Sequence, residues 1–321
     1  ISMTLKKFDG STLTVTNMNA ASYTVNPVLK DSVYTTTNGH KVGYIVFNSF
    51  TSDANADPKL NAAFDYFTAQ GVTDLVVDLR YNGGGYVSTA EYLDNLIVPA
   101  SKNGTLMYNT YYTDNMANGT DPLLKHQVRK NPSNGSLYNY GQFDYSVAAN
   151  AVNFAKQRSL NVTRVFFIVS GSTASASELT INNLRPFMDV QFIGRTSYGK
   201  PVGFFDIQIN KYTMYTPEFS TKNSAGQGDY YDGFNPGTTG YPGVNDFDDP
   251  TKDFGDPTEG LLAHALHYVT VGTYAVNSPG SQGIPAPGKA LSLQASRQMT
   301  LEMDRHAFNG MIFNKTLKLK K

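Results

Sequence analysis

The stretch TDLVVDLRYNGGGYVSTAEYLDNLIV, residues 73–98, decides the fold of this 321-residue chain. It starts with an apolar run of strand length, passes through a turn with three consecutive glycines, and ends in a segment with helical spacing. A second stretch, VFFIVSGSTASASELTINNL at 165–184, repeats the order of strand, small-residue turn and helix. This alternation predicts an α/β core with parallel strand pairs.

The segments around these two stretches extend the same pattern. KVGYIVFNSF at 41–50 and VQFIG at 190–194 predict two more buried strands. A helix is expected over 57–71, with Pro58 near its start and Gly71 at its end. Three further elements are expected: a helix over 144–159, a β hairpin over 203–217, and a helix over 256–269 capped by Asp256.

At roughly 150 residues per domain, the length allows two domains. The first 30 residues alternate apolar and polar side chains around a DGS turn, which predicts a β ribbon. A core is then expected over 31–270, with a surface excursion over 100–142, and residues 271–321 form a tail rich in Pro, Gly and Ser. The start ISMTLKK has neither an initiator Met nor a signal-peptide pattern, as expected of a trimmed chain.

Composition excludes several functions. The 26 Lys and Arg residues balance the 26 Asp and Glu residues, so the chain has no electrostatic footprint for nucleic acid. No apolar run approaches the ~20 residues of a membrane-spanning helix. The absence of Cys excludes disulfides, thiolate metal sites and a cysteine nucleophile. Covalent catalysis must therefore use Ser, Thr, Lys or a carboxylate.

The glycine-rich turn and the serine-rich turn each permit a structural and a functional interpretation. Three glycines can expose backbone N–H groups to an anion or oxyanion, or can simply form a tight turn. Phosphate binding is disfavoured because no GxxxxGK[ST] pattern is present. Ser175 and Glu178 form an S-x-x-E capping box, or Ser175 is an exposed nucleophile over a helix N-terminus, with the Ala176 N–H beside it.

The two turns and a third segment together resemble the C-terminal processing, or tail-specific, serine proteases. Three motifs carry the resemblance: D-L-R-x-N-x-G-G at 78–85, A-S-A-S-E at 174–178, and G-x-x-S-Y-G-K at 194–200. Ser175 precedes Lys200 by 25 residues, the separation of nucleophile and base in that family. Ser172 and Ser177 precede Lys200 by 28 and 23 residues, so the resemblance selects Ser175.

The resemblance implies a crotonase-like α/β fold and a serine peptidase that hydrolyses proteins or peptides without a cofactor or metal. Ser175 would attack the peptide carbonyl, and Lys200 would accept its proton as a neutral amine. The apolar residues beside Lys200 favour a lowered pKa. Gly84 and Ala176 would bind the oxyanion, and Glu178 would cap the helix or orient the pair.

Some features depart from the family pattern or extend it. An acidic residue often found eleven positions after the nucleophile is replaced by Pro186, and a usual proline in the first motif is replaced by Gly83. The N-terminal ribbon resembles the last strands of the PDZ domain that precedes the core in this family. The resemblance also implies a place in the bacterial cell envelope.

Other interpretations stay open at this stage. His40 is kept as an alternative base, because tricorn-like relatives pair Ser with His. His264 and His267 lack further ligands for zinc, and the acidic residues of 246–256 lack an EF-hand pattern. The rival functions are an inactive peptide-binding protein of the same fold and, more weakly, an acyl-CoA enzyme. The sequence does not indicate the oligomeric state.

Overall fold

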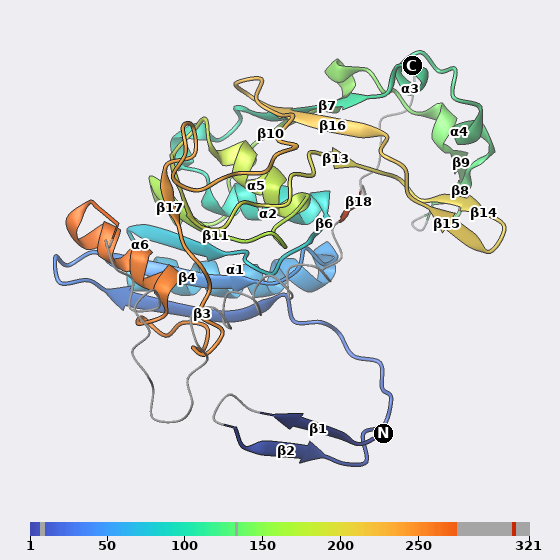
Figure 1. Ribbon diagram of the computed structural model, residues 1–321. Coiled ribbons are helices and arrows are strands. Elements are labelled where there is room, and N and C mark those ends of the chain that lie inside the picture. Colours follow the sequence, from blue (N-terminus) through green and yellow to red (C-terminus); the bar gives the residue numbers. More distant parts are fainter. Residues whose placement is uncertain (7–9, 132–133, 275–309, 313–321) are drawn as a thin grey trace.

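A central six-stranded sheet organises the computed structural model, which describes residues 1–6, 10–131, 134–274 and 310–312 (Figure 1). The strand order is β17-β12-β11-β5-β4-β3, and all neighbours are parallel except β3 and β4. The strands are β3 (Val28–Thr35), β4 (Lys41–Phe47), β5 (Asp74–Asp78), β11 (Arg164–Val169), β12 (Asp189–Gly194) and β17 (Gly243–Asn245). The expected α/β core is therefore confirmed.

The inner strands are mostly apolar because both faces of the sheet are covered, and their charged residues lie at the strand ends. On β11, Phe166 and Ile168 face one core cluster, and Val165 and Phe167 face the other. Helix α6 (Gly260–Val271) covers the first face. Helices α1 (Asp53–Gln70), α2 (Val87–Ile97) and α5 (Ala176–Leu184) supply the second cluster. Each strand thus alternates between two cores.

Two helix starts differ from the sequence expectation. Helix α1 begins at Asp53, so Pro58 lies inside it rather than near its start, although it ends as expected at Gly71 in a left-handed conformation (φ 70°). The N-cap of α6 is Glu259, not Asp256. Glu259 accepts hydrogen bonds from the N–H groups of the first turn, while Asp256 accepts from Thr258 in the preceding turn.

A second, four-stranded antiparallel sheet lies beyond α2 and α5 (Figure 1). It contains β10 (Ala151–Asn153), β7 (Leu106–Tyr112), β16 (Phe219–Asn223) and β13 (Val202–Gly203). The helix expected over 144–159 is wrong: a 3-10 turn, η3 (Val147–Asn150), leads into β10. Asparagine favours helix ends and turns, and pairing with β7 outweighs the weak helical pattern. The surface excursion expected over 100–142 is also wrong in part, because it contains β7, which is half-buried in this sheet.

Smaller elements surround these sheets. They are the hairpins β1 (Met3–Lys6) with β2 (Thr12–Val15), β8 (Val128–Lys130) with β9 (Leu137–Asn139), and β14 (Ile207–Ile209) with β15 (Tyr212–Met214), and the short helices η1 (Ala100–Lys102), α3 (Asp114–Ala117), α4 (Pro122–His126) and η2 (Tyr140–Gln142). The hairpins predicted near the N-terminus and over 203–217 are confirmed. A third apolar cluster joins α3 and α4 to Phe143, Tyr145 and Phe205. This cluster forms the aromatic subdomain on the right in Figure 1.

The two ends of the predicted core meet the central sheet. Strand β3 crosses residue 30, so the sheet includes residues from the segment expected to be a ribbon. Most of the tail expected over 271–321 lies outside the described residues. Two parts of it are described: residues 271–274, which include the end of α6, and β18 (Gly310–Ile312), which pairs in parallel with β6 (Gly84–Tyr86) of the glycine-rich turn.

A buried ionic cluster around Arg80 joins three distant segments. The guanidinium, only 4% exposed, pairs with Asp78 at the end of β5, with Asp248, and with Glu259 at the start of α6. Tyr81 also donates to Asp248. Although burial opposes the charged form, the three carboxylates raise the pKa of Arg80. Arg80 therefore joins the turn after β5 to the start of α6 and to the segment of Asp248.

Replacing Arg80 with Met should lower the free energy of unfolding by about 3–5 kcal/mol, because three buried carboxylates lose their counter-charge. Urea unfolding followed by far-UV circular dichroism measures the loss. The matched control is Arg158→Met, which breaks an exposed pair with Asp65 and should cost less than about 1 kcal/mol. Equal losses in the two variants would contradict the role given to the cluster.

Candidate active site

The three sequence motifs follow three neighbouring parallel strands. The glycine-rich turn follows β5, the turn with Ser175 follows β11, and the loop that leads to Lys200 follows β12. In register, Asp78 lies beside Ile168, and Val169 beside Gly194. Because the carboxyl ends of parallel strands share one edge, the motifs meet there, where α/β sheets form their sites.

Ser175 occupies a strained turn at the N-terminus of α5. Its φ of 61° and ψ of −110° are unfavourable for a residue with a Cβ, a strain that is common at functional turns. The side chain is fully buried, and within the described part of the chain its Oγ has no hydrogen-bond partner. Ser175 and Glu178 have the arrangement of a capping box, in which Glu178 Oε2 accepts from the Ser175 N–H at 2.9 Å, but Ser175 Oγ itself makes no hydrogen bond of normal geometry to the described residues. The hydroxyl stays available for chemistry.

Glu178 joins the Ser175 turn to the loop before Lys200. Its Oε1 accepts from Ser197 Oγ at 2.6 Å and from the Gly199 N–H at 2.7 Å. Its Oε2 accepts from the Ser175 N–H and from the Lys200 N–H at 2.8 Å. Burial raises the pKa of this carboxyl, and the four hydrogen bonds oppose that rise. All four partners donate, which is the pattern that an ionised carboxylate accepts.

Lys200 lies half-buried after this loop. Its Nζ is 4.7 Å from the centre of the Phe204 ring. Burial lowers the pKa of its amine, and the negative charge of Glu178 raises it. Ser175 Oγ and Lys200 Nζ do not form a hydrogen bond with each other. Such bonds are often long without substrate and tighten when it binds.

Asn82 fastens the glycine-rich turn to the turn of Ser175. Its carbonyl oxygen accepts from the Ala174 N–H at 3.1 Å and from Ser177 Oγ at 2.9 Å, and its side-chain amide donates to the Phe47 carbonyl. Gly85 has a φ of 139°, and a Cβ there would lie 2.1 Å from the Phe50 carbonyl oxygen. Only glycine fits so close to that backbone.

The two predicted oxyanion donors differ in their present partners. Ala176 is the first residue of α5, so its N–H has no partner inside the helix. The Gly84 N–H already donates to Asn82 Oδ1 at 2.9 Å. An oxyanion would therefore have to share this N–H with Asn82 or take it over.

The structure does not bring His40 to the other candidates. His40 precedes β4 and contacts Asp74 at the start of β5, with Nδ1 and Oδ2 3.0 Å apart. Ser175 follows the other ends of the strands. Asp74 and Asp78 are separated by four residues, or about 13 Å of strand at ~3.3 Å per residue. His40 therefore lies at the opposite edge of the sheet.

The other polar groups weighed in the sequence have separate partners. His264 is buried against Asp246, and His267 Nδ1 lies 2.7 Å from the Thr273 carbonyl oxygen. Asp248 belongs to the Arg80 cluster. In the described ranges, no three His, Cys, Asp or Glu residues are grouped so that they could hold a metal ion.

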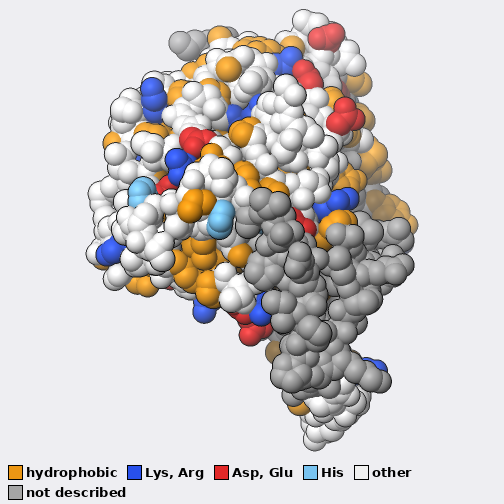
Figure 2. All heavy atoms as spheres, turned by 60° about the vertical axis from the view of Figure 1, so that its left-hand side comes forward, with side chains coloured by type: hydrophobic (Ala, Val, Ile, Leu, Met, Phe, Trp, Pro, Cys, Tyr) orange, Lys and Arg blue, Asp and Glu red, His pale blue; other side chains and the backbone are white. Residues whose placement is uncertain are grey.

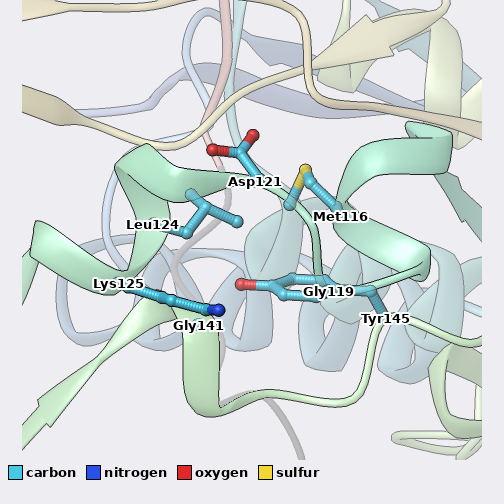
Figure 3. Close-up of a pocket in the computed structure, with 7 residues that line it drawn as sticks. All are labelled: Met116, Gly119, Asp121, Leu124, Lys125, Gly141 and Tyr145. Carbon is cyan, nitrogen blue, oxygen red and sulfur yellow. The ribbon is translucent and has the colours of Figure 1, made fainter.

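In the described residues two hollows lie away from the three motifs: an open one of about 560 Å³ between β3 and α6, and a small one in the aromatic subdomain. The cavity drawn in Figure 3 lies in the aromatic subdomain. Its volume is about 10 Å³, which is room for about one water. It is lined by Met116, Gly119, Asp121, Leu124, Lys125, Gly141 and Tyr145. On the face in Figure 2, acidic and basic side chains are interspersed rather than gathered into patches. In the described part of the chain, every helix is too short or too polar to cross a membrane.

Sequence reasoning missed the parts played by Asn82 and Ser197. Both lie inside the recognised motifs, so their positions carried a signal, but their partners come from other segments. The polar contacts of Thr173, which donates to the Leu79 carbonyl at 2.7 Å, are equally non-local. The strand β18 beside the glycine-rich turn had no signal in the tail sequence.

Solved structures similar to this chain include a protein described as an S41 protease from Bacteroides fragilis NCTC 9343, with 24% identity and a TM-score of 0.59 over 84% of this chain. The photosystem II D1 C-terminal processing protease has 20% identity and a TM-score of 0.43 over 70% of this chain. Mature CPAF complexed with lactacystin has 12% identity and a TM-score of 0.43 over 73%. This chain spans 65%, 50% and 62% of their respective lengths. No curated protein matches it.

A comparison with protein families matches residues 41–227 to Peptidase family S41. These residues include β4, β5, β11 and β12 of the central sheet and all three motifs quoted above. Because the match covers more than half of the sequence, the chain belongs to peptidase family S41, as the resemblance of its three motifs predicted.

Proposed function

We propose that the chain is a serine endopeptidase that hydrolyses peptide bonds of protein substrates with a Ser175/Lys200 dyad. The observation that supports this most is the buried Glu178 carboxylate, which hydrogen-bonds both the Ser175 N–H and the Lys200 N–H. Two backbone positions that share one carboxylate oxygen lie near each other whatever their side-chain rotamers. Catalysis then requires the two side chains to bring Oγ and Nζ into contact when substrate binds.

The reaction divides between these groups. The neutral Lys200 amine takes the proton of Ser175 Oγ as the oxygen attacks the peptide carbonyl carbon. The resulting oxyanion lies at the N-terminus of α5, where the Ala176 N–H and the helix dipole stabilise negative charge. The Lys200 ammonium then gives its proton to the leaving amine, and an acyl-enzyme remains. Water, deprotonated by the same amine, releases the acyl product.

The rival function is that of a peptide-binding protein that has lost turnover. Ser175 and Lys200 are both present, and the hydroxyl is held without a competing hydrogen bond, which favours catalysis. Preference for substrate C-termini and a place in the cell envelope are proposals that rest on the family resemblance alone. Neither is needed for the dyad.

Replacing Ser175 with Ala should reduce cleavage of an unstructured protein such as β-casein by at least about three orders of magnitude, because the nucleophile is lost. Ser172→Ala is the matched control, since Ser172 is also buried and its Oγ also has no partner in the described residues. It should keep the parental rate. Cleavage by Ser175→Ala at the parental rate would refute the assignment, and labelling of Ser175 by a fluorophosphonate probe separates a peptidase from a binding protein.

The rate constant kcat/KM should rise with pH through an apparent pKa below the ~10.4 of free lysine. Burial lowers the pKa of Lys200, so its neutral form becomes abundant at lower pH than that of a free amine. Initial rates on a fluorogenic peptide measure the profile between about pH 6 and pH 10.5, where the fold is intact by circular dichroism. This range of about 4.5 units spans the shift expected for a buried amine. Lys200→Ala should be inactive throughout, and an unchanged profile in that variant would exclude Lys200 as the base.

Glu178→Gln should lower kcat and move the remaining pH profile to lower pH. The amide cannot accept all four hydrogen bonds, and removal of the negative charge takes away the interaction that raises the pKa of Lys200. The control is Glu218→Gln, another buried carboxyl that accepts from Phe205 and Thr216. Glu218→Gln should lower stability and leave the profile in place. Equal shifts in both variants would contradict the positioning role of Glu178.

A further inference from the structure

Strand β18 runs beside the candidate active site. It pairs in parallel with β6, with Gly310 beside Gly84, Met311 beside Gly85 and Ile312 beside Tyr86. It also contacts β13. Strand β6 begins at the predicted oxyanion residue, and β13 begins two residues after Lys200. Strand β18 of the tail therefore lies between β6 and β13, which follow the glycine-rich turn and Lys200 (Figure 1).

The edge of β6 suits an extended peptide of almost any sequence. Its residues are two glycines and Tyr86, so little side-chain bulk stands between the backbone and an added strand. Strand addition uses main-chain hydrogen bonds, which give affinity without demanding particular side chains. Such an edge matches what a peptidase needs from the backbone around a scissile bond.

Ser175 is fully buried in this state, although a nucleophile must reach its substrate. Part of the chain has to move before a protein substrate can contact the Ser175 hydroxyl. Strand β18 pairs with β6 in a separate two-stranded sheet and is not part of the six-stranded sheet. It can leave without disrupting the central sheet.

We propose that the β6 edge is the binding site for the extended backbone of a substrate, and that residues 310–312 of this chain occupy it as a built-in competitor. This inference rests on the proposed peptidase function. Because the competitor belongs to the same chain, its binding does not depend on the protein concentration, and an added substrate must compete with it. The structure then corresponds to a self-inhibited state.

A disulfide between β6 and β18 tests the occupancy directly, because this 321-residue chain has no Cys of its own. Tyr86 and Ile312 are register partners. The Cα atoms of paired residues in neighbouring strands lie within the 4.4–6.8 Å range of disulfides. The double variant Tyr86→Cys with Ile312→Cys, in the full chain, should form an intramolecular disulfide with diamide, detected by mass spectrometry after thiol alkylation. The control pairs Tyr86→Cys with Gly310→Cys, two residues out of register, and should crosslink much less.

Cleavage of β-casein by the same double variant tests whether tail and substrate share the site. The oxidised protein should cleave about tenfold more slowly or worse than the reduced protein, because a covalently held strand cannot leave. Reduction should restore the rate. Failure of the register pair to crosslink better than its control would overturn the occupancy, and equal rates before and after reduction would overturn the shared site.

The two proposals can fail separately. If the reduced variant and the parent both lack peptidase activity and Ser175 is not labelled by the serine probe, the proposed function fails, and with it the substrate half of this inference. The crosslink still decides whether residues 310–312 occupy the β6 edge. If the parent is active and the crosslink does not form, only the inference about the tail is overturned.

Discussion

The site depends on one buried carboxylate. Glu178 lies on the first turn of α5, yet three of its four donors come from the loop after β12. Burial of a carboxylate costs free energy unless its oxygens are fully hydrogen-bonded, and here both oxygens have two donors each. The loop that carries Lys200 must therefore adopt the one path that presents its N–H groups to Glu178. A structural requirement of α5 thus fixes the relative positions of the candidate base and nucleophile.

The order of strands makes this arrangement possible. Strands β5, β11 and β12 are neighbours, so the turns after them meet although they are separated by about 90 and 25 residues in the sequence. Asn82 then links the first two turns, as Glu178 links the second and third. The Arg80 cluster secures the first turn from the other side of the sheet. Each of the three turns is therefore held in place by hydrogen bonds or ion pairs from neighbouring segments.

The sequence predicted the strands and helices that carry strong patterns and short-range signals. The runs at 41–50 and 165–170 are apolar because both faces of their sheet are buried, and Gly71 ends α1 because it can adopt a positive φ. The three motifs were correctly assigned to one family because their order and spacing are read along the chain. The helix expected over 144–159 was wrong because its pattern is weak and pairing with β7, some 40 residues earlier, decides its structure.

The contacts that complete the site were beyond sequence reasoning for the same physical reason. The S-x-x-E pattern indicated a capping box. It could not reveal that most of the hydrogen bonds to the Glu178 carboxylate come from the loop after β12, or that Ser175 Oγ has no hydrogen-bond partner in the described residues. A capped serine would be a poor nucleophile, because its hydroxyl would already be engaged. Here Ser175 Oγ makes no hydrogen bond within the described part of the chain while the Glu178 carboxylate still accepts from the Ser175 N–H, so a common helix-start motif becomes a candidate catalytic turn. The glycines of β6 also have two uses. The absence of a side chain at Gly85 permits close contact with the Phe50 backbone, and the glycines leave the other edge of β6 accessible to an added strand. Position within the fold, more than residue type, separates the structural use of these motifs from the catalytic one.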